Sequence, residues 1–181
     1  AEALGSYYCG KHVGSHGDAA TFSFFGNKTI TTGEGGMLQF RQTEMKERAK
    51  VLRDHGMSPS RRYWHDEMGF NYRLTNMQAA VGVAQIERVE YFVQQKRWLA
   101  DRYAHYLGGV NNITLPNDCL KFINSYWLYT IILSTHLDGK RDNILESLKG
   151  SGIEARPVFF PMHKMPPYQT FGDGSNYPVS T

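Results

Sequence analysis

The chain has only two cysteines, Cys9 and Cys119, among its 181 residues. They lie far apart and have no companions at the spacing of zinc ligands, so we expect neither a disulfide framework nor a structural metal. The sequence also lacks an apolar run of the roughly 18 residues that a membrane span needs. The start lacks the charged and apolar segments of a signal peptide. These absences favour a cytoplasmic protein without membrane contact.

Neither sign of charge is in large excess, because 20 lysines and arginines stand against 17 aspartates and glutamates. The basic residues gather in one region only, at Lys46, Lys50, Arg53, Arg61 and Arg62. Such a region is usually a solvated face, and a nucleotide diphosphate is the functional alternative. Nucleic acid is not an expected partner, since the sequence holds no recognised binding module.

The apolar and turn-forming residues predict an α/β fold. In the first part, they predict a Gly-rich hairpin within residues 7–17 and two short strands, at residues 20–24 and 37–40. A helix is predicted from Thr43 until Gly56 ends it. Residues 58–72 have no periodicity and are predicted to form a loop.

The second part is predicted to begin with one long helix, from about Asn76 to about Leu107, which Thr75 or Asn76 caps. Its first turns are apolar on two sides, which indicates burial on two sides. Further on, a strand at residues 125–133, a short helix at 141–148 and a strand at 153–160 follow β-α-β order.

Three segments are predicted as domains or their connection: 1–75 as the end of a large domain, 76–108 as a linking helix, and 109–181 as a small α/β domain. The chain starts at Ala1 without an initiator Met. We therefore expect a piece that lacks an N-terminal part and the extreme C-terminus, and that is inactive by itself.

One lysine stands among small and polar residues directly after an apolar strand. Gly26 precedes Lys28, and Gly33, Gly35 and Gly36 follow it, which lets a ligand approach the backbone closely. A solvated loop lysine is the ordinary interpretation. The alternative is a partly desolvated amine that traps a carbonyl group and holds pyridoxal phosphate as a Schiff base.

Several motifs together resemble successive signatures of the DegT/StrS-type nucleotide-sugar aminotransferases, in the family's order and spacing. They are residues 1–5, 17–18, 22–28, 31–36 and 69–74. The resemblance extends over essentially the whole chain. Near the end, residues 152–163 and 165–168 are most similar to the perosamine-forming branch. The resemblance to the family implies the fold of a fold-type-I aminotransferase that depends on pyridoxal 5′-phosphate.

The resemblance also implies roles for individual residues. Lys28 would be the catalytic lysine, Ser23 would bind the cofactor phosphate, and Glu2 would lie near the cofactor ring. Asn71 would reach the cofactor phosphate of the neighbouring subunit in a homodimer, and His163 would contact the substrate. Without the resemblance, Ser23 can equally be a buried serine bonded to backbone, and Asn71 a turn residue.

The implied reaction transfers an amino group from glutamate to a keto group of a nucleotide-linked deoxysugar, with GDP-4-keto-6-deoxymannose as the first choice. A dTDP- or UDP-linked keto sugar is the alternative within the family. The same scaffold hosts sugar dehydratases with histidine in place of the lysine, and Lys28 disfavours them. A non-catalytic fragment that binds the cofactor or a carbohydrate is the remaining alternative.

Overall fold

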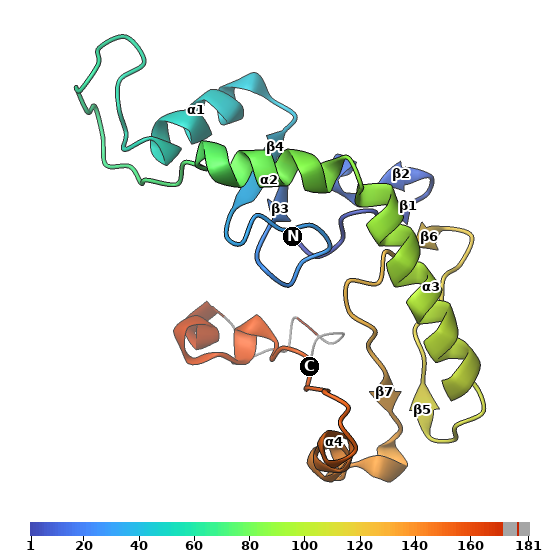
Figure 1. Cartoon of the computed structure of the whole chain (residues 1–181). Helices are drawn as coiled ribbons and strands as arrows, with labels where there is room; N and C mark the ends of the chain where they lie inside the picture. The colour runs from blue at the N-terminus through green and yellow to red at the C-terminus, as the bar shows by residue number, and fades with distance from the viewer. Residues whose placement is uncertain (172–176, 178–181) are drawn as a thin grey trace. The chain divides into compact units, whose positions relative to one another are not determined.

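The computed structural model describes residues 1–171 and residue 177 (Figure 1). They form two compact units. The first consists of Ala1–Val110 and Leu115–Tyr129, and the second of Asn111–Thr114 and the described residues from Thr130 onward. Residues 115–129, which follow the predicted linking helix, thus group with the first unit. The predicted division into functional domains stays a prediction.

The N-terminal hairpin is present as predicted. Strands β1 (Tyr7–Tyr8) and β2 (Lys11–His12) pair antiparallel, and β1 also pairs with β6 (Phe122–Ile123). Cys9 and Gly10 form the turn with φ angles of 48° and 75°. Positive φ at both positions is what a tight two-residue hairpin turn requires.

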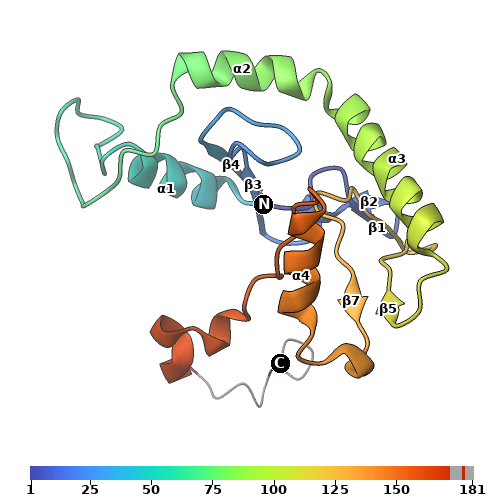
Figure 2. The same cartoon turned by 60° about the horizontal axis from the view of Figure 1, so that its bottom comes forward.

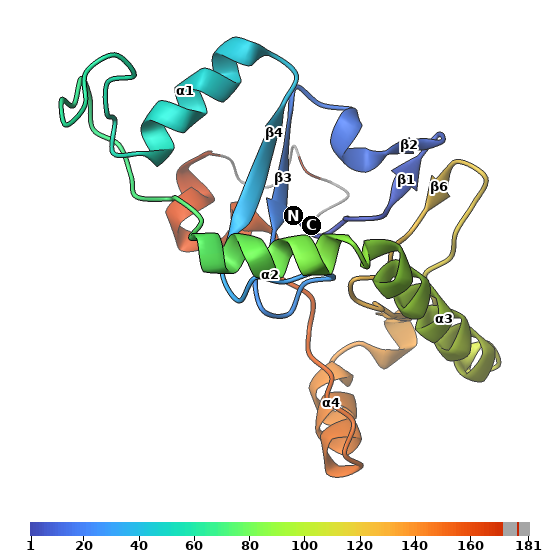
Figure 3. The same ribbon diagram turned by 45° about the horizontal axis from the view of Figure 1, so that its top comes forward.

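The predicted strands on either side of the lysine loop are confirmed as β3 (Ala19–Ser23) and β4 (Gly36–Phe40), which lie side by side in Figure 3. Their register sets Ser23 opposite Gly36, so residues 24–35 form a loop that is closed at its base. A Cβ atom on Gly36 would lie only 2.7 Å from the carbonyl oxygen of Phe22. Glycine therefore lets the chain re-enter the sheet at this point.

Helix α1 (Thr43–Arg53) confirms the predicted helix, and a long loop follows it. Two glycines let distant parts of this loop touch, since a Cβ atom on Gly69 would overlap the backbone of Gly56. Asp54 and Asn71 form an isolated antiparallel bridge, which fixes the two ends of the loop together.

Two helices, α2 (Asn76–Ile86) and α3 (Val89–Leu107), stand where one long helix was predicted (Figure 2). The prediction of a continuous helix was wrong because the helical backbone is interrupted at Arg88, in the middle of the predicted helix. The Arg88 N–H donates to the carbonyl of Gln85, three residues back, at 3.1 Å, and Arg88 has the non-helical angles φ −114° and ψ 10°. The predicted cap is confirmed, since Thr75 and Gln78 form a capping box.

In the second unit, β5 (Ile113–Thr114) pairs antiparallel with β7 (Ile132–Leu133), and α4 (Arg141–Gly150) confirms the predicted helix. Three short 3-10 helices complete it: η2 (Thr135–Leu137), η3 (Met162–Lys164) and η4 (Pro166–Phe171). A further 3-10 turn, η1 (Val13–Ser15), belongs to the first unit.

Two strand predictions fail. Only Ile132–Leu133 of the predicted strand 125–133 is a strand, because the residues before it turn sharply at Tyr126, whose φ is 52°. The predicted strand 153–160 has no strand partner within the described residues, so its backbone makes no ladder. Its apolar side chains remain exposed, including Val158, Phe159 and Phe160.

The most deeply buried side chains of the described residues all lie in the first unit. They are Ile30, Thr32, Ala100, Ser6, Ser125, Tyr126 and Trp127. This small core joins the lysine loop to α3 and to the segment after β6. Among the described helices, none has the length and apolar character needed to cross a membrane.

Candidate active site

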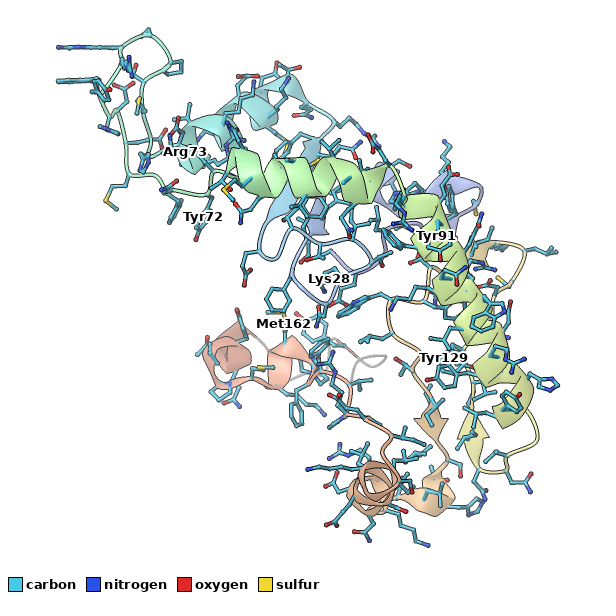
Figure 4. The ribbon with its side chains drawn as sticks, in the orientation of Figure 1. Lys28, Tyr72, Arg73, Tyr91, Tyr129 and Met162 are labelled. Carbon is cyan, nitrogen blue, oxygen red and sulfur yellow. The ribbon has the colours of Figure 1, made fainter. Side chains whose placement is uncertain are left out.

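The loop that carries Lys28 is held by its own backbone. The N–H groups of Phe24 and Thr32 donate to the carbonyls of Gly35 and Phe24, both at 2.9 Å, and the Lys28 N–H donates to the carbonyl of Phe25 at 3.0 Å. These bonds close a tight turn at residues 25–28. The lysine backbone is therefore fixed directly beyond the end of β3 (Figure 4).

The Lys28 side chain is 13% exposed and contacts two groups. Its Nζ lies 3.4 Å from Oε1 of Glu2 and 3.5 Å from the centre of the Trp127 ring. A partly buried ammonium group needs such partners, because it has lost much of its contact with water. The structure thus brings together Lys28 and Glu2, two of the predicted site residues.

Ser23 lies at the end of β3, at the base of the same loop. Its Oγ accepts a hydrogen bond from the Phe25 N–H at 3.4 Å, so its own O–H stays available as a donor. A shallow hollow beside β3 is lined by Phe22 and Ser23 together with Ala1 and Ala3, but not by Lys28. The amine, hydroxyl and carboxylate near this loop fit pyridoxal phosphate, because an amine can bond to its aldehyde, a hydroxyl can donate to its phosphate, and a carboxylate can accept a hydrogen bond near its ring.

Asn71 lies in the loop before α2, and among the described residues its side chain contacts Arg73 rather than the Lys28 loop. Its Oδ1 accepts a hydrogen bond from Nε of Arg73 at 3.3 Å, and Nη1 of Arg73 lies 3.3 Å from Oδ1 of Asp54. Tyr72 and Arg73 are well separated from Lys28 in Figure 4. Arg73 donates to the amide oxygen, and the Asn71 amide N–H groups are chemically able to donate to an anion.

His163 belongs to the second unit, in η3. Its ring stacks on Tyr177 with centroids 4.9 Å apart. Within the described residues, its Nε2 is buried without a hydrogen-bond partner. A buried imidazole nitrogen of this kind is able to bind a polar ligand group, so the predicted substrate role stays a prediction.

Sequence reasoning missed Trp127 and the polar network that supports it. Nε1 of Trp127 donates to the carbonyl of Asn27 at 2.8 Å, although the two residues are 100 positions apart. No local sequence pattern predicts a contact between residues so far apart in the chain. The only sequence signal was an aromatic pair, Tyr126 and Trp127, directly after polar residues in a segment predicted as a strand.

The network centres on Asp118, which Arg97 of α3 contacts at 2.7 Å. Partial burial would raise the pKa of the Asp118 carboxyl, but hydrogen bonds from the Asn124 N–H and from Arg97 outweigh it and lower the pKa. Burial, together with the nearby Asp118 charge, raises the pKa of the Tyr126 hydroxyl. Both groups therefore keep their ordinary charge states at neutral pH.

Sequence comparison identifies close relatives. The GDP-perosamine synthase of Caulobacter vibrioides is 48% identical over 169 residues, which are 93% of this chain and 46% of that protein. The GDP-perosamine synthase of Vibrio cholerae is 41% identical over 180 residues, or 99% of this chain and 49% of that protein. The chain thus spans about half the length of the curated relatives it matches.

Solved structures agree. PseC of Helicobacter pylori, an aminotransferase involved in the biosynthesis of pseudoaminic acid, superposes with a TM-score of 0.87 at 32% identity, covering 94% of this chain and 46% of that chain. The putative sugar aminotransferase Spr1654 of Streptococcus pneumoniae superposes with a TM-score of 0.84 at 28% identity, covering 98% and 47%. These similarities confirm the predicted α/β fold of the sugar aminotransferases.

A sequence model of the DegT/DnrJ/EryC1/StrS aminotransferase family matches residues 1–181. This match confirms the resemblance of the motifs. The match extends over the whole chain, and relatives above 40% identity accompany it. The chain belongs to the DegT/DnrJ/EryC1/StrS aminotransferase family.

Proposed function

We propose that the full-length protein is a sugar aminotransferase that moves an amino group from glutamate to the keto group of a nucleotide-linked deoxysugar, GDP-4-keto-6-deoxymannose. The observation that carries the proposal is the partly buried Lys28 amine on its closed loop, in a chain 48% identical to a GDP-perosamine synthase. The UDP-sugar transaminase of Helicobacter pylori is more distant, at 33% identity. The GDP-linked substrate is therefore favoured over a UDP-linked one.

Pyridoxal phosphate, when bound, supplies an electron sink that makes the C–N bond chemistry of transamination accessible. Lys28 would form the covalent bond to the cofactor's aldehyde carbon and, when free, its Nζ would carry a proton to or from the reacting carbon. The Ser23 hydroxyl would donate to the cofactor phosphate. The Glu2 carboxylate, next to the Lys28 amine, would accept a hydrogen bond from it and limit its movement.

Asn71 supports a homodimeric site in this proposal. In the described part of the chain, the Asn71 side chain contacts Arg73 rather than the Lys28 loop, and its amide N–H groups would donate to an anion on a second subunit. His163 would contact sugar hydroxyls of the substrate. The enzyme would work in the cytoplasm, where its proposed substrates, nucleotide sugars and glutamate, are soluble metabolites.

A substrate panel tests the proposed specificity. The full-length protein, with pyridoxal phosphate and glutamate, is offered GDP-, dTDP- and UDP-linked 4-keto-6-deoxy sugars, and the amino sugar is measured by mass spectrometry. We expect amination of the GDP-linked sugar, with the other two at least about tenfold slower. Amination of only a dTDP- or UDP-linked sugar would overturn the choice of nucleotide but not the reaction. No amination of any sugar, with cofactor bound, would favour the non-catalytic alternative.

A further inference from the structure

The Trp127 ring lies against the Lys28 amine, the group to which the proposed function assigns a chemical role. We propose that Trp127 is a positioning residue, whose indole ring and N–H together hold the Lys28 loop and aim the Lys28 amine. The placement of the amine stands on geometry alone, whereas its consequence for turnover rests on the proposed function.

Two parts of the indole, its ring face and its N–H group, contact the loop. The ring face lies 3.5 Å from Lys28 Nζ, and the Nε1–H donates to the carbonyl of Asn27, the residue before the lysine, at 2.8 Å. A cation over a Trp face is attracted by the ring's negative face. The backbone bond fixes the start of the side chain, and the ring contact fixes its end.

The indole is itself held firmly. Trp127 is 9% exposed, and its neighbour Ser125 is fully buried. The Ser125 N–H donates to Oγ of Ser6 at 3.0 Å, and the two hydroxyls lie 2.9 Å apart. Ser6 follows the segment that carries Glu2, so these hydrogen bonds link the two segments that contact the Lys28 amine.

Helix α3 holds the turn at Tyr126 from the side of the residues that precede it. Arg97 donates to the carbonyl of Asn124 at 2.6 Å and to Oδ2 of Asp118 at 2.7 Å. The Asn124 N–H donates to Oδ1 of Asp118 at 2.9 Å. These bonds stabilise the sharp turn at Tyr126, whose φ is 52°, and so determine where the Trp127 ring lies.

The position of the amine can be measured without the reaction. In the cofactor-free full-length protein, lysines are reductively methylated with ¹³C, and Lys28→Arg assigns the Lys28 signal. Because the amine lies over an indole face, we expect its methyl signal upfield of those of exposed lysines. Trp127→Leu should move the signal to the exposed position. Trp127→Phe, which keeps a ring but loses the N–H, should leave part of the shift.

Trp98→Leu is the matched control, since Trp98 is exposed and stacks on Arg102 rather than on Lys28. It should leave the Lys28 signal unchanged. A Lys28 signal that lies at the exposed position in the wild type, or that Trp127→Leu and Trp127→Phe both leave in place, would overturn the proposal. If Trp127→Leu does not fold, the Trp127→Phe spectrum alone decides.

Kinetics test the functional consequence. We expect Trp127→Leu to slow the spectral change on adding pyridoxal phosphate to the cofactor-free protein, and to lower kcat, each by about tenfold, with little change in KM. Trp127→Phe should lie between. Unchanged rates in both variants would overturn the positioning role. A shifted methyl signal in a protein that never binds the cofactor at Lys28 would leave the placement intact and refute the proposed function instead.

Discussion

At the scale of single residues, the Lys28 amine has one charged partner and one aromatic partner, and they differ in burial. Glu2 is 52% exposed at its side chain, whereas Trp127 is buried. Water and salt screen an exposed ion pair, so its energy is small. The aromatic contact is therefore expected to matter more for the position of the amine than the carboxylate does.

Glu2→Gln tests this ranking. The variant keeps the size and the hydrogen-bond acceptor but removes the charge, so we expect kcat/KM to fall by no more than about fivefold, the equivalent of an exposed ion pair. Glu34→Gln, at an exposed carboxylate on the Lys28 loop itself, is the control. A loss as large as that of Trp127→Leu would show that Glu2 acts directly on the cofactor or the substrate.

At the scale of elements, the Arg97–Asp118 pair joins α3 to the turn that carries Trp127. The pKa of Asp118 is lowered in the folded protein, so the ionised carboxylate stabilises the fold. This stabilisation is fully present above the unfolded pKa of about 3.9 and is lost as the pH falls through the lower folded pKa.

Asp118→Asn should therefore reduce the free energy of unfolding by about 1–2 kcal/mol at neutral pH, and the difference from the wild type should shrink as the pH falls below the unfolded pKa of about 3.9. Urea unfolding at several pH values measures it. Asp18→Asn, at an exposed carboxylate, should show little effect at any pH. A difference that stays constant into acid would contradict the role given to the ionised form.

The capping box of α2 gives a second test at this scale. Oγ1 of Thr75 accepts a hydrogen bond from the Gln78 N–H at 3.2 Å. Thr75→Ala leaves this N–H unpaired, so we expect a loss of about 1 kcal/mol in the free energy of unfolding. Thr43→Ala, in the first turn of α1, should change it by less than about 0.5 kcal/mol. Equal effects of the two variants would contradict the cap.

Elements with local causes could be predicted from the sequence. The hairpin at Cys9–Gly10, the strands around the lysine loop, α1, α4 and the Thr75 cap follow from turn chemistry, spacing and capping residues. The break at Arg88 could not be predicted, because Glu87 and Arg88 are good helix formers. The strand prediction for residues 153–160 failed because apolar side chains do not by themselves supply a hydrogen-bond partner for the backbone.

The candidate site divides in the same way. Lys28 and Ser23 could be proposed from one stretch of sequence, because a strand end and a glycine-rich turn define their surroundings. Trp127 could not, since its contact with the Lys28 loop depends on the fold of the residues between them. The support from Arg97 and Asp118 is equally long-range and leaves no periodic pattern.

At the scale of the whole molecule, a dimeric site predicts that two defective proteins repair each other. In a mixed dimer of Lys28→Arg and Asn71→Ala, one site would combine both defects and the other would have neither. Co-expression at equal levels should therefore restore about a quarter of wild-type activity, because about half of the dimers are mixed.

The control replaces Asn71→Ala by the double variant Lys28→Arg/Asn71→Ala, which should restore nothing. Activity of the mixture no higher than the average of the two separate variants would contradict a role for Asn71 in the neighbouring site. Asn71 would then act within its own subunit or only as a residue of the loop before α2.

The central claim is that Lys28 is the amine that binds the cofactor. The most direct test is borohydride reduction of the full-length protein after incubation with pyridoxal phosphate, followed by peptide mass spectrometry. The account predicts a pyridoxyl group on Lys28 alone, and its disappearance in Lys28→Arg, with turnover reduced by at least about a thousandfold. A folded dimer labelled only at other lysines, or not labelled at all, would contradict the account.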